Sequence, residues 1–144
     1  MLPMLLATLL QVSAGPSDES CYGAATTQSA MNQCAGAALK VADARLDEFL
    51  STYADRLSPE QRELLHTAQS DWQQFRESSC KFKASGVRGG SAYRMVLAQC
   101  LASQAEARLL EMKLIASCQE GDLSCPSYSR GAPHNSFKAN LIGG

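Results

Sequence analysis

Apolar side chains recur every three or four residues along three long stretches of this chain, residues 27–57, 58–83 and 91–117. This spacing puts them on one face of an α-helix and predicts three amphipathic helices. The first stretch is rich in alanine, which would let a neighbouring helix approach closely. The expected core positions are Met31, Cys34, Ala35, Ala38, Ala42, Leu46, Phe49, Leu50, Tyr53 and Leu57 in the first stretch, Leu64, Leu65, Ala68, Trp72, Phe75, Ser79 and Cys80 in the second, and Met95, Val96, Cys100, Leu101, Ala107, Leu110 and Leu114 in the third.

Short connections join the three predicted helices. Ser58 suits the N-cap of the second helix, Pro59 its first position and Gln61 the reciprocal position of a capping box. Residues 85–91 contain three glycines, which oppose helix formation, and Ser91 can cap the third helix. Because helices joined by short connections pack antiparallel, the predicted fold is all-α: an up-down-up antiparallel helical bundle with local disulfide staples and an irregular C-terminal tail.

The two ends of the chain differ in composition from the predicted bundle. Residues 1–14 are apolar and uncharged and end in small residues, as in a signal peptide cleaved after Ala14. This run is too short to cross a bilayer. The first cysteine, Cys21, lies too far downstream to be a lipid-attachment site, so we expect no membrane anchor. The predicted organisation is a signal peptide over 1–14, a helical domain over 15–117 and a disulfide-pinned polar tail over 118–144.

Six cysteines follow the predicted signal peptide, an even number that indicates a disulfide framework and an oxidising compartment. Six cysteines allow many pairings, and spacing narrows them without deciding among them. Pairing between neighbours in the sequence gives Cys21–Cys34, Cys80–Cys100 and Cys118–Cys125. Each bridge would add roughly 2–4 kcal/mol of stability by restricting the unfolded chain.

Charge and motifs argue against several classes of function. The net charge is −1, which leaves no electrostatic footprint for nucleic acid and no polybasic patch for a membrane surface. No two cysteines have the close spacing of a zinc site, and His66 and His134 are the available histidines. The chain has no nucleophile elbow and no phosphate-binding loop. We therefore expect no metal, no cofactor and no enzymatic activity.

Three blocks of residues occur in an order that resembles a known family. They are Thr27-Gln28, Met31-Asn32, Cys34-Ala35, Ala42-Asp43 and Leu46; then Ala68-Gln69, Trp72, Phe75-Arg76 and Cys80; then Gly89-Gly90-Ser91 and Gln99-Cys100-Leu101. In this order the chain resembles the LprI-type lysozyme-inhibitor-like family of bacterial envelope proteins, from about Cys21 to Leu114. The resemblance implies a small helical protein, periplasmic or secreted, whose protein partner is lysozyme.

Several residues have both a structural and a functional interpretation. Trp72 could anchor an interface, but its place on the apolar stripe with Phe75 favours core packing. Arg76 could contact a ligand, but pairing with Asp43 of the first helix is favoured. Gln28 and Asn32 are expected to satisfy backbone groups where the N-terminal arm folds back.

The glycine-rich connection is the best candidate for binding a partner. Cys80 and Cys100 would fix its base, while Gly86, Gly89 and Gly90 would let its backbone enter a cleft, with Val87 and Arg88 at the tip. The alternative is a plain interhelical turn whose glycines serve backbone geometry. We expect a secreted or periplasmic inhibitor of animal-type lysozyme that occludes the glycan cleft sterically. The alternative is an envelope module that binds another protein or peptidoglycan.

Overall fold

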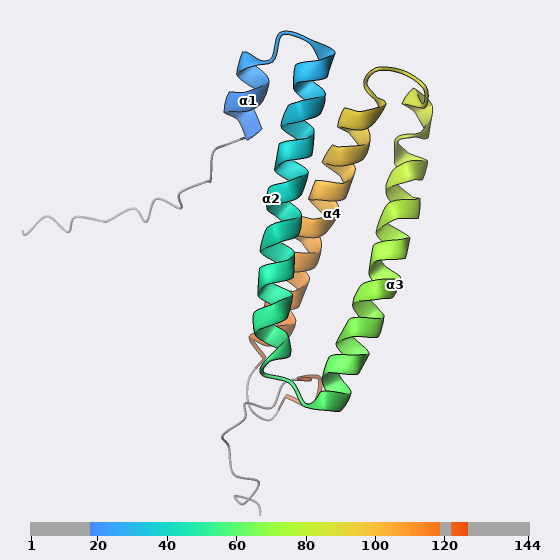
Figure 1. The fold of residues 1–144 in the computed structure, drawn as a ribbon. Helices are drawn as coiled ribbons and strands as arrows, with labels where there is room; N and C mark the ends of the chain where they lie inside the picture. Colours follow the sequence, from blue (N-terminus) through green and yellow to red (C-terminus); the bar gives the residue numbers. More distant parts are fainter. Residues whose placement is uncertain (1–17, 119–121, 127–144) are drawn as a thin grey trace, which may run out of the picture.

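The computed structural model describes residues 18–118 and 122–126, and these residues form antiparallel helices joined by short turns (Figure 1). The elements are α1 (Asp18–Ala24), α2 (Gln28–Ala54), α3 (Pro59–Lys83), the 3-10 turn η1 (Ser85–Val87) and α4 (Tyr93–Ala116). The predicted all-α, up-down-up arrangement is confirmed for α2, α3 and α4. The predicted signal peptide over 1–14 and the tail after Pro126 lie outside the described residues.

Local sequence signals explain where α2 and α3 begin. Thr27 caps α2, because its hydroxyl oxygen accepts a hydrogen bond from the Ala30 amide at 3.1 Å. At the start of α3 the Ser58 hydroxyl accepts from the Gln61 amide at 3.2 Å, and the Gln61 side chain accepts from the Ser58 amide at 3.0 Å. This reciprocal pair is the capping box that the sequence predicts.

The start of α4 differs from the prediction. The residue that precedes the helix is Ala92, which has no side chain able to cap it, so the assignment of Ser91 as N-cap is wrong. Residues 91–92 belong to a turn in which the Tyr93 amide donates to the Gly90 carbonyl at 3.2 Å. The helix therefore begins one residue later than an N-cap at Ser91 would place it.

The core lies mainly between α2 and α4, which pack against each other more extensively than any other pair of elements. One cluster joins Ala42 and Leu46 of α2 to Ala102 and Ala105 of α4, and a second cluster continues the contact toward the other end of the bundle. Alanine on both helices allows the two backbones to approach closely. Full burial of a leucine side chain such as Leu46 contributes roughly 1.5–3 kcal/mol.

The buried face of α4 is rotated from the face predicted. Its buried residues are Ala98, Ala102, Ala105 and Met112, whereas Leu110 and Leu114 are 61% and 65% exposed. This part of the core prediction is therefore wrong. Apolar residues surround α4 on most sides, so periodicity alone did not decide which of them meet α2. The close packing of alanines decides it.

The N-terminal region also holds an element that the sequence reading missed. The residues before α2 form the short helix α1, and the bridge Cys21–Cys34 joins it to α2 with Cα atoms 5.8 Å apart. The Tyr22 hydroxyl also accepts a hydrogen bond from the Gln99 side chain of α4 at 2.9 Å. Together these contacts fold the N-terminal arm onto the bundle. No helix in the described ranges has the length and apolarity needed to cross a membrane.

Candidate functional site at the α3–α4 connection

The connection between α3 and α4 is an exposed, tightly turned segment at one end of the bundle (Figure 1). Successive backbone hydrogen bonds organise it: the Val87 amide donates to Ala84 at 3.1 Å, the Arg88 amide to Ser85 at 3.2 Å and the Gly90 amide to Val87 at 3.0 Å. The side chains of Val87 and Arg88 are exposed, and Val87 is 39% accessible. The predicted tip residues, Val87 and Arg88, are therefore exposed to solvent. Local backbone hydrogen bonds order the turn that carries them.

Two glycines have different structural reasons for being in this segment. Gly89 has φ +83°, in the left-handed region where a side chain is strained. A Cβ atom on Gly90 would lie 3.2 Å from the Val87 carbonyl oxygen, tighter than most such contacts. Gly86 has neither constraint. The glycines at positions 89 and 90 thus serve the geometry of the turn.

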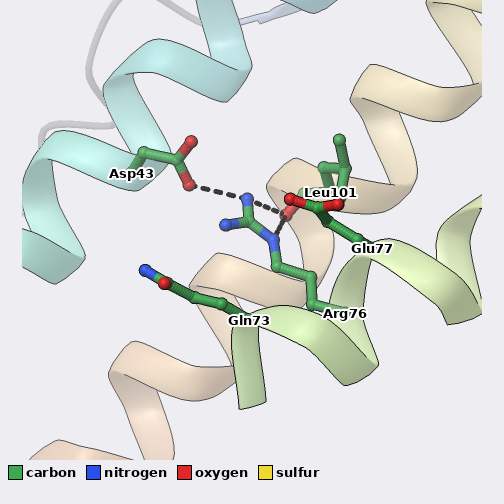
Figure 2. Close-up of a pocket in the computed structure, with 5 residues that line it drawn as sticks. All are labelled: Asp43, Gln73, Arg76, Glu77 and Leu101. Carbon is green, nitrogen blue, oxygen red and sulfur yellow. Dashed lines mark hydrogen bonds and ion pairs between the residues drawn. The ribbon is translucent and has the colours of Figure 1, made fainter. Parts of the chain in front are cut away.

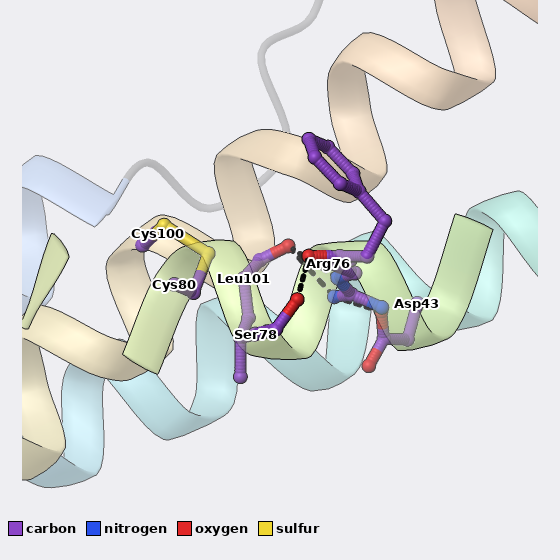
Figure 3. The surroundings of a disulfide bond; sticks show 7 residues. Asp43, Arg76, Ser78, Cys80, Cys100 and Leu101 are labelled. Atoms are coloured by element: carbon purple, nitrogen blue, oxygen red, sulfur yellow. Dashed lines mark hydrogen bonds and ion pairs between the residues drawn. A yellow bond between two sulfur atoms is a disulfide. The ribbon is translucent and has the colours of Figure 1, made fainter. Parts of the chain in front are cut away.

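A disulfide holds the base of the connection. Cys80 of α3 and Cys100 of α4 are bonded, with Cα atoms 5.6 Å apart, and Cys80 is fully buried (Figure 3). Ala84, which follows α3, is also fully buried. The third bridge, Cys118–Cys125, lies near the opposite end of α4. All three disulfides predicted from pairing between neighbouring cysteines are therefore present in the structure.

An amide network ties the connection to α2. The Asn32 side chain donates to the Ser91 carbonyl at 3.0 Å and accepts from the Gln28 side chain at 3.0 Å, and the Gln28 side chain also lies 3.6 Å from the Met95 sulfur. Gln28 and Asn32 were expected to satisfy backbone groups where the N-terminal arm folds back. Asn32 does bond to a backbone carbonyl, but that carbonyl belongs to residue 91 in the α3–α4 connection and not to the arm. The spacing of Gln28 and Asn32, one helical turn apart, predicts that they share a face of α2. Only the fold shows that this face meets the α3–α4 connection.

Arg76 joins all three long helices one turn before the disulfide (Figure 3). Its Nη2 donates to an Asp43 carboxylate oxygen at 2.6 Å and to the Leu101 carbonyl at 2.7 Å, and its Nε donates to the same carbonyl at 3.0 Å. Arg76 is 9% exposed, and its guanidinium lies over the Trp72 ring at 5.2 Å. This network fixes α3 against α2 and α4 below the connection.

Of the two aromatic residues predicted for the core of α3, the structure buries one in part. Trp72 is half-buried, packs against the cluster of Ala42 and Leu46, and has Arg108 over its ring at 5.7 Å. Phe75 is 60% exposed, and Leu64 and Ala68 are exposed as well, so the placement of these three residues in the core is wrong. The inward position is taken by the next residue, Arg76, because its hydrogen bonds to α2 and α4 turn that edge of α3 toward the bundle.

A groove of about 310 Å³ borders the Arg76 network (Figure 2). Its lining residues are Asp43, Gln73, Arg76, Glu77 and Leu101. Both carboxylates already have cationic partners, Asp43 in Arg76 and Glu77 in Lys81 at 3.3 Å. The groove therefore offers no unpaired couple for acid–base chemistry. Within the described ranges, no group of three His, Cys, Asp or Glu side chains is placed to hold a metal ion.

Comparison with known proteins gives a match to one family. The family model described as lysozyme inhibitor LprI matches residues 21–112, which include the Cys21–Cys34 and Cys80–Cys100 bridges, the Arg76 network and the whole α3–α4 connection. No curated protein and no solved structure matches the chain.

Proposed function

Because the chain belongs to the LprI lysozyme inhibitor family, we propose that it inhibits an animal-type lysozyme by placing its α3–α4 connection in the glycan cleft of the enzyme. The family is one of inhibitors rather than of enzymes. Disulfides between the described cysteines fit a periplasmic or extracellular protein, where lysozyme would be met. The observation that carries the proposal is that Val87 and Arg88 are exposed on a turn whose base is held by the Cys80–Cys100 bridge.

Rigidity supports the choice of this segment over the helix faces. The base is held by the Cys80–Cys100 bridge, by the Asn32 contact with residue 91 and by the turn's own backbone hydrogen bonds. A segment that is already ordered loses little conformational entropy when it binds, which favours tight association. An inhibitor of this kind only has to fill the cleft, and no bond in it needs to be made or broken.

The chemistry of the tip supports a glycan cleft as its target. Glycosidases of the lysozyme type carry two carboxyl groups flanking the bond they cleave. Arg88 supplies an exposed guanidinium that can pair with a carboxylate, and the neighbouring Val87 supplies apolar surface. The absence of a side chain at Gly89 and Gly90 narrows the connection behind these two residues. We propose that Arg88 faces the catalytic carboxylates while Val87 packs on the cleft wall.

An alanine series tests the proposed contact. In a cell-wall turbidity assay with animal-type lysozyme, Val87→Ala with Arg88→Ala is expected to raise the inhibition constant at least tenfold. The matched control is Val41→Ala with Arg94→Ala, which removes the same side chains from exposed positions outside the connection. An inhibition constant unchanged in the first variant, with wild-type helical content by circular dichroism, would show that the connection is not the inhibitory element.

A further inference from the structure

The outward face of α3 carries large apolar side chains that no described residue covers. Leu64, Phe75 and Phe82 are 65%, 60% and 79% exposed. They lie about three and two helical turns apart, so they share one side of the helix, with Ala68 between the first two. We call these four residues the α3 stripe. An exposed apolar surface of this kind typically marks an interaction site.

The position of α3 in the bundle leaves this stripe accessible. The helix forms one edge of the bundle, packs against α4 and makes fewer contacts with α2 (Figure 1). Its inward side is occupied by Gln69, Trp72 and Arg76, which bond or pack against the other helices. On α3 the usual arrangement of apolar side chains inside and polar side chains outside is therefore partly reversed, because Gln69 and Arg76 face inward while Phe75 and Phe82 face outward. Phe75 and Phe82 bury little of their surface within the chain, which leaves them accessible to a partner.

We propose that the α3 stripe is the interface of a homodimer in which two copies of α3 pack antiparallel. In an isologous pair the twofold axis makes each residue meet its counterpart from the reversed helix. Placing Leu64 opposite Phe82 of the second copy brings the two ends of the stripe onto each other. The same register puts Phe75 near the axis, opposite Asp71 of the second copy. The apolar ends of the stripe are therefore complementary to those of its reversed copy, whereas its centre pairs Phe75 with a carboxylate.

Charges beside the stripe fit the same register. Glu63 and Lys81 are both exposed and lie five helical turns apart, so they occupy the same flank of the stripe. The twofold axis brings this flank of one copy beside the same flank of the other. In the register set by Leu64 and Phe82, Glu63 and Lys81 of the second copy fall at levels about 3 Å apart along the helix. Lys81 also pairs with Glu77 of its own helix at 3.3 Å, and its exposed ammonium group can contact Glu63 of the second copy as well. Two intermolecular Glu63–Lys81 pairs result.

Asp71 limits the strength of the interface. It is exposed and lies within the stripe, between Ala68 and Phe75, so its two copies approach each other near the axis. Because two nearby carboxylates repel each other, Asp71 opposes association. We therefore expect the dimer to form reversibly at micromolar concentrations. Asp71→Asn should therefore tighten the dimer severalfold.

Sedimentation velocity of the oxidised mature chain, over micromolar to near-millimolar concentrations at low ionic strength, tests the proposal. A reversible monomer–dimer equilibrium is expected, and Phe82→Glu should abolish it. Val41→Glu adds the same charge at an apolar position on α2 that is 49% exposed, and it should leave the equilibrium unchanged. Circular dichroism of each variant checks that the helices are intact.

Charge reversal tests the register itself. Glu63→Lys and Lys81→Glu should each raise the dimer dissociation constant about tenfold, and the double variant should restore it. A chain that is monomeric throughout, a dimer that survives Phe82→Glu, or single reversals without rescue would each overturn the proposal. A monomer whose binding to lysozyme is lost in Phe82→Glu would also overturn it and would assign the stripe to the enzyme instead.

Discussion

Replacing Arg76 by methionine is expected to be among the most destabilising single changes in this fold. The substitution keeps a long side chain but removes the hydrogen bonds to Asp43 and Leu101 and the contact of the guanidinium with Trp72. A hydrogen bond to a charged group contributes roughly 1.5–3 kcal/mol. The 9% exposure of Arg76 means that water cannot readily replace these bonds on the Leu101 carbonyl.

The partner carboxylate moderates the loss. The side chain of Asp43 is 40% exposed, so it can turn toward water when the guanidinium is gone and is not left as a fully buried charge. We therefore expect the free energy of unfolding to fall by about 3 kcal/mol, which is a large part of the 5–15 kcal/mol that a typical domain has. For a domain of this size the midpoint of thermal unfolding should fall by more than about 10 °C.

Urea unfolding of the oxidised protein, followed by circular dichroism, measures this difference. The matched control is Lys81→Met on the same helix, which removes an exposed cation paired with Glu77 at 3.3 Å. That pair should contribute less than about 0.5 kcal/mol, because both side chains are hydrated. If Arg76→Met and Lys81→Met unfold at the same urea concentration, Arg76 is not the structural link inferred from its contacts.

The other predictions concern the connection and the tail. Gly89→Ala should lower the free energy of unfolding by about 1–2 kcal/mol because of its positive φ, whereas Gly86→Ala should change it little, and thermal melts of the two compare them directly. Cys80→Ser with Cys100→Ser removes a bridge between residues 20 apart in sequence and should lower the free energy of unfolding, measured in urea, by about 3 kcal/mol. The same variant should inhibit lysozyme more weakly, and unchanged inhibition would show that the bridge does not hold the connection for binding. The side-chain and backbone hydrogen bonds from Ser124 lower the pKa of Asp122 below its ordinary value, so the turn they form should persist at neutral pH and be lost as acid protonates this carboxylate. An NMR titration of the Ser124 amide would show this, and a shift that does not follow the Asp122 carboxyl would contradict it.

The sequence predicted those features that depend on local signals. Ser58 lies at the start of α3 because its side chain caps an exposed amide, and the capping box that it forms with Gln61 can be recognised from spacing alone. The bridges join cysteines that are neighbours in the sequence, so antiparallel packing is enough to bring Cys80 to Cys100. The pairing of Arg76 with Asp43 follows from the same arrangement.

The features that the sequence did not predict depend on how the helices are rotated about their axes. Phe75 and Leu110 have the character of core residues, yet both are exposed, because the inward positions go to Arg76 and to the small alanines of α4. When two adjacent faces of a helix both carry apolar residues, periodicity does not show which of them is buried. The contact of Asn32 with residue 91 likewise joins segments far apart in the chain, and no local pattern encodes it.

Lysozyme inhibition is tested most directly by titrating animal-type lysozyme with the oxidised protein in a cell-wall turbidity assay. We expect saturable inhibition that is complete when the inhibitor matches the enzyme in molar amount, and that is weakened by Val87→Ala with Arg88→Ala. Undiminished lysis in the presence of excess protein, with its helices shown to be intact by circular dichroism, would contradict the proposed function.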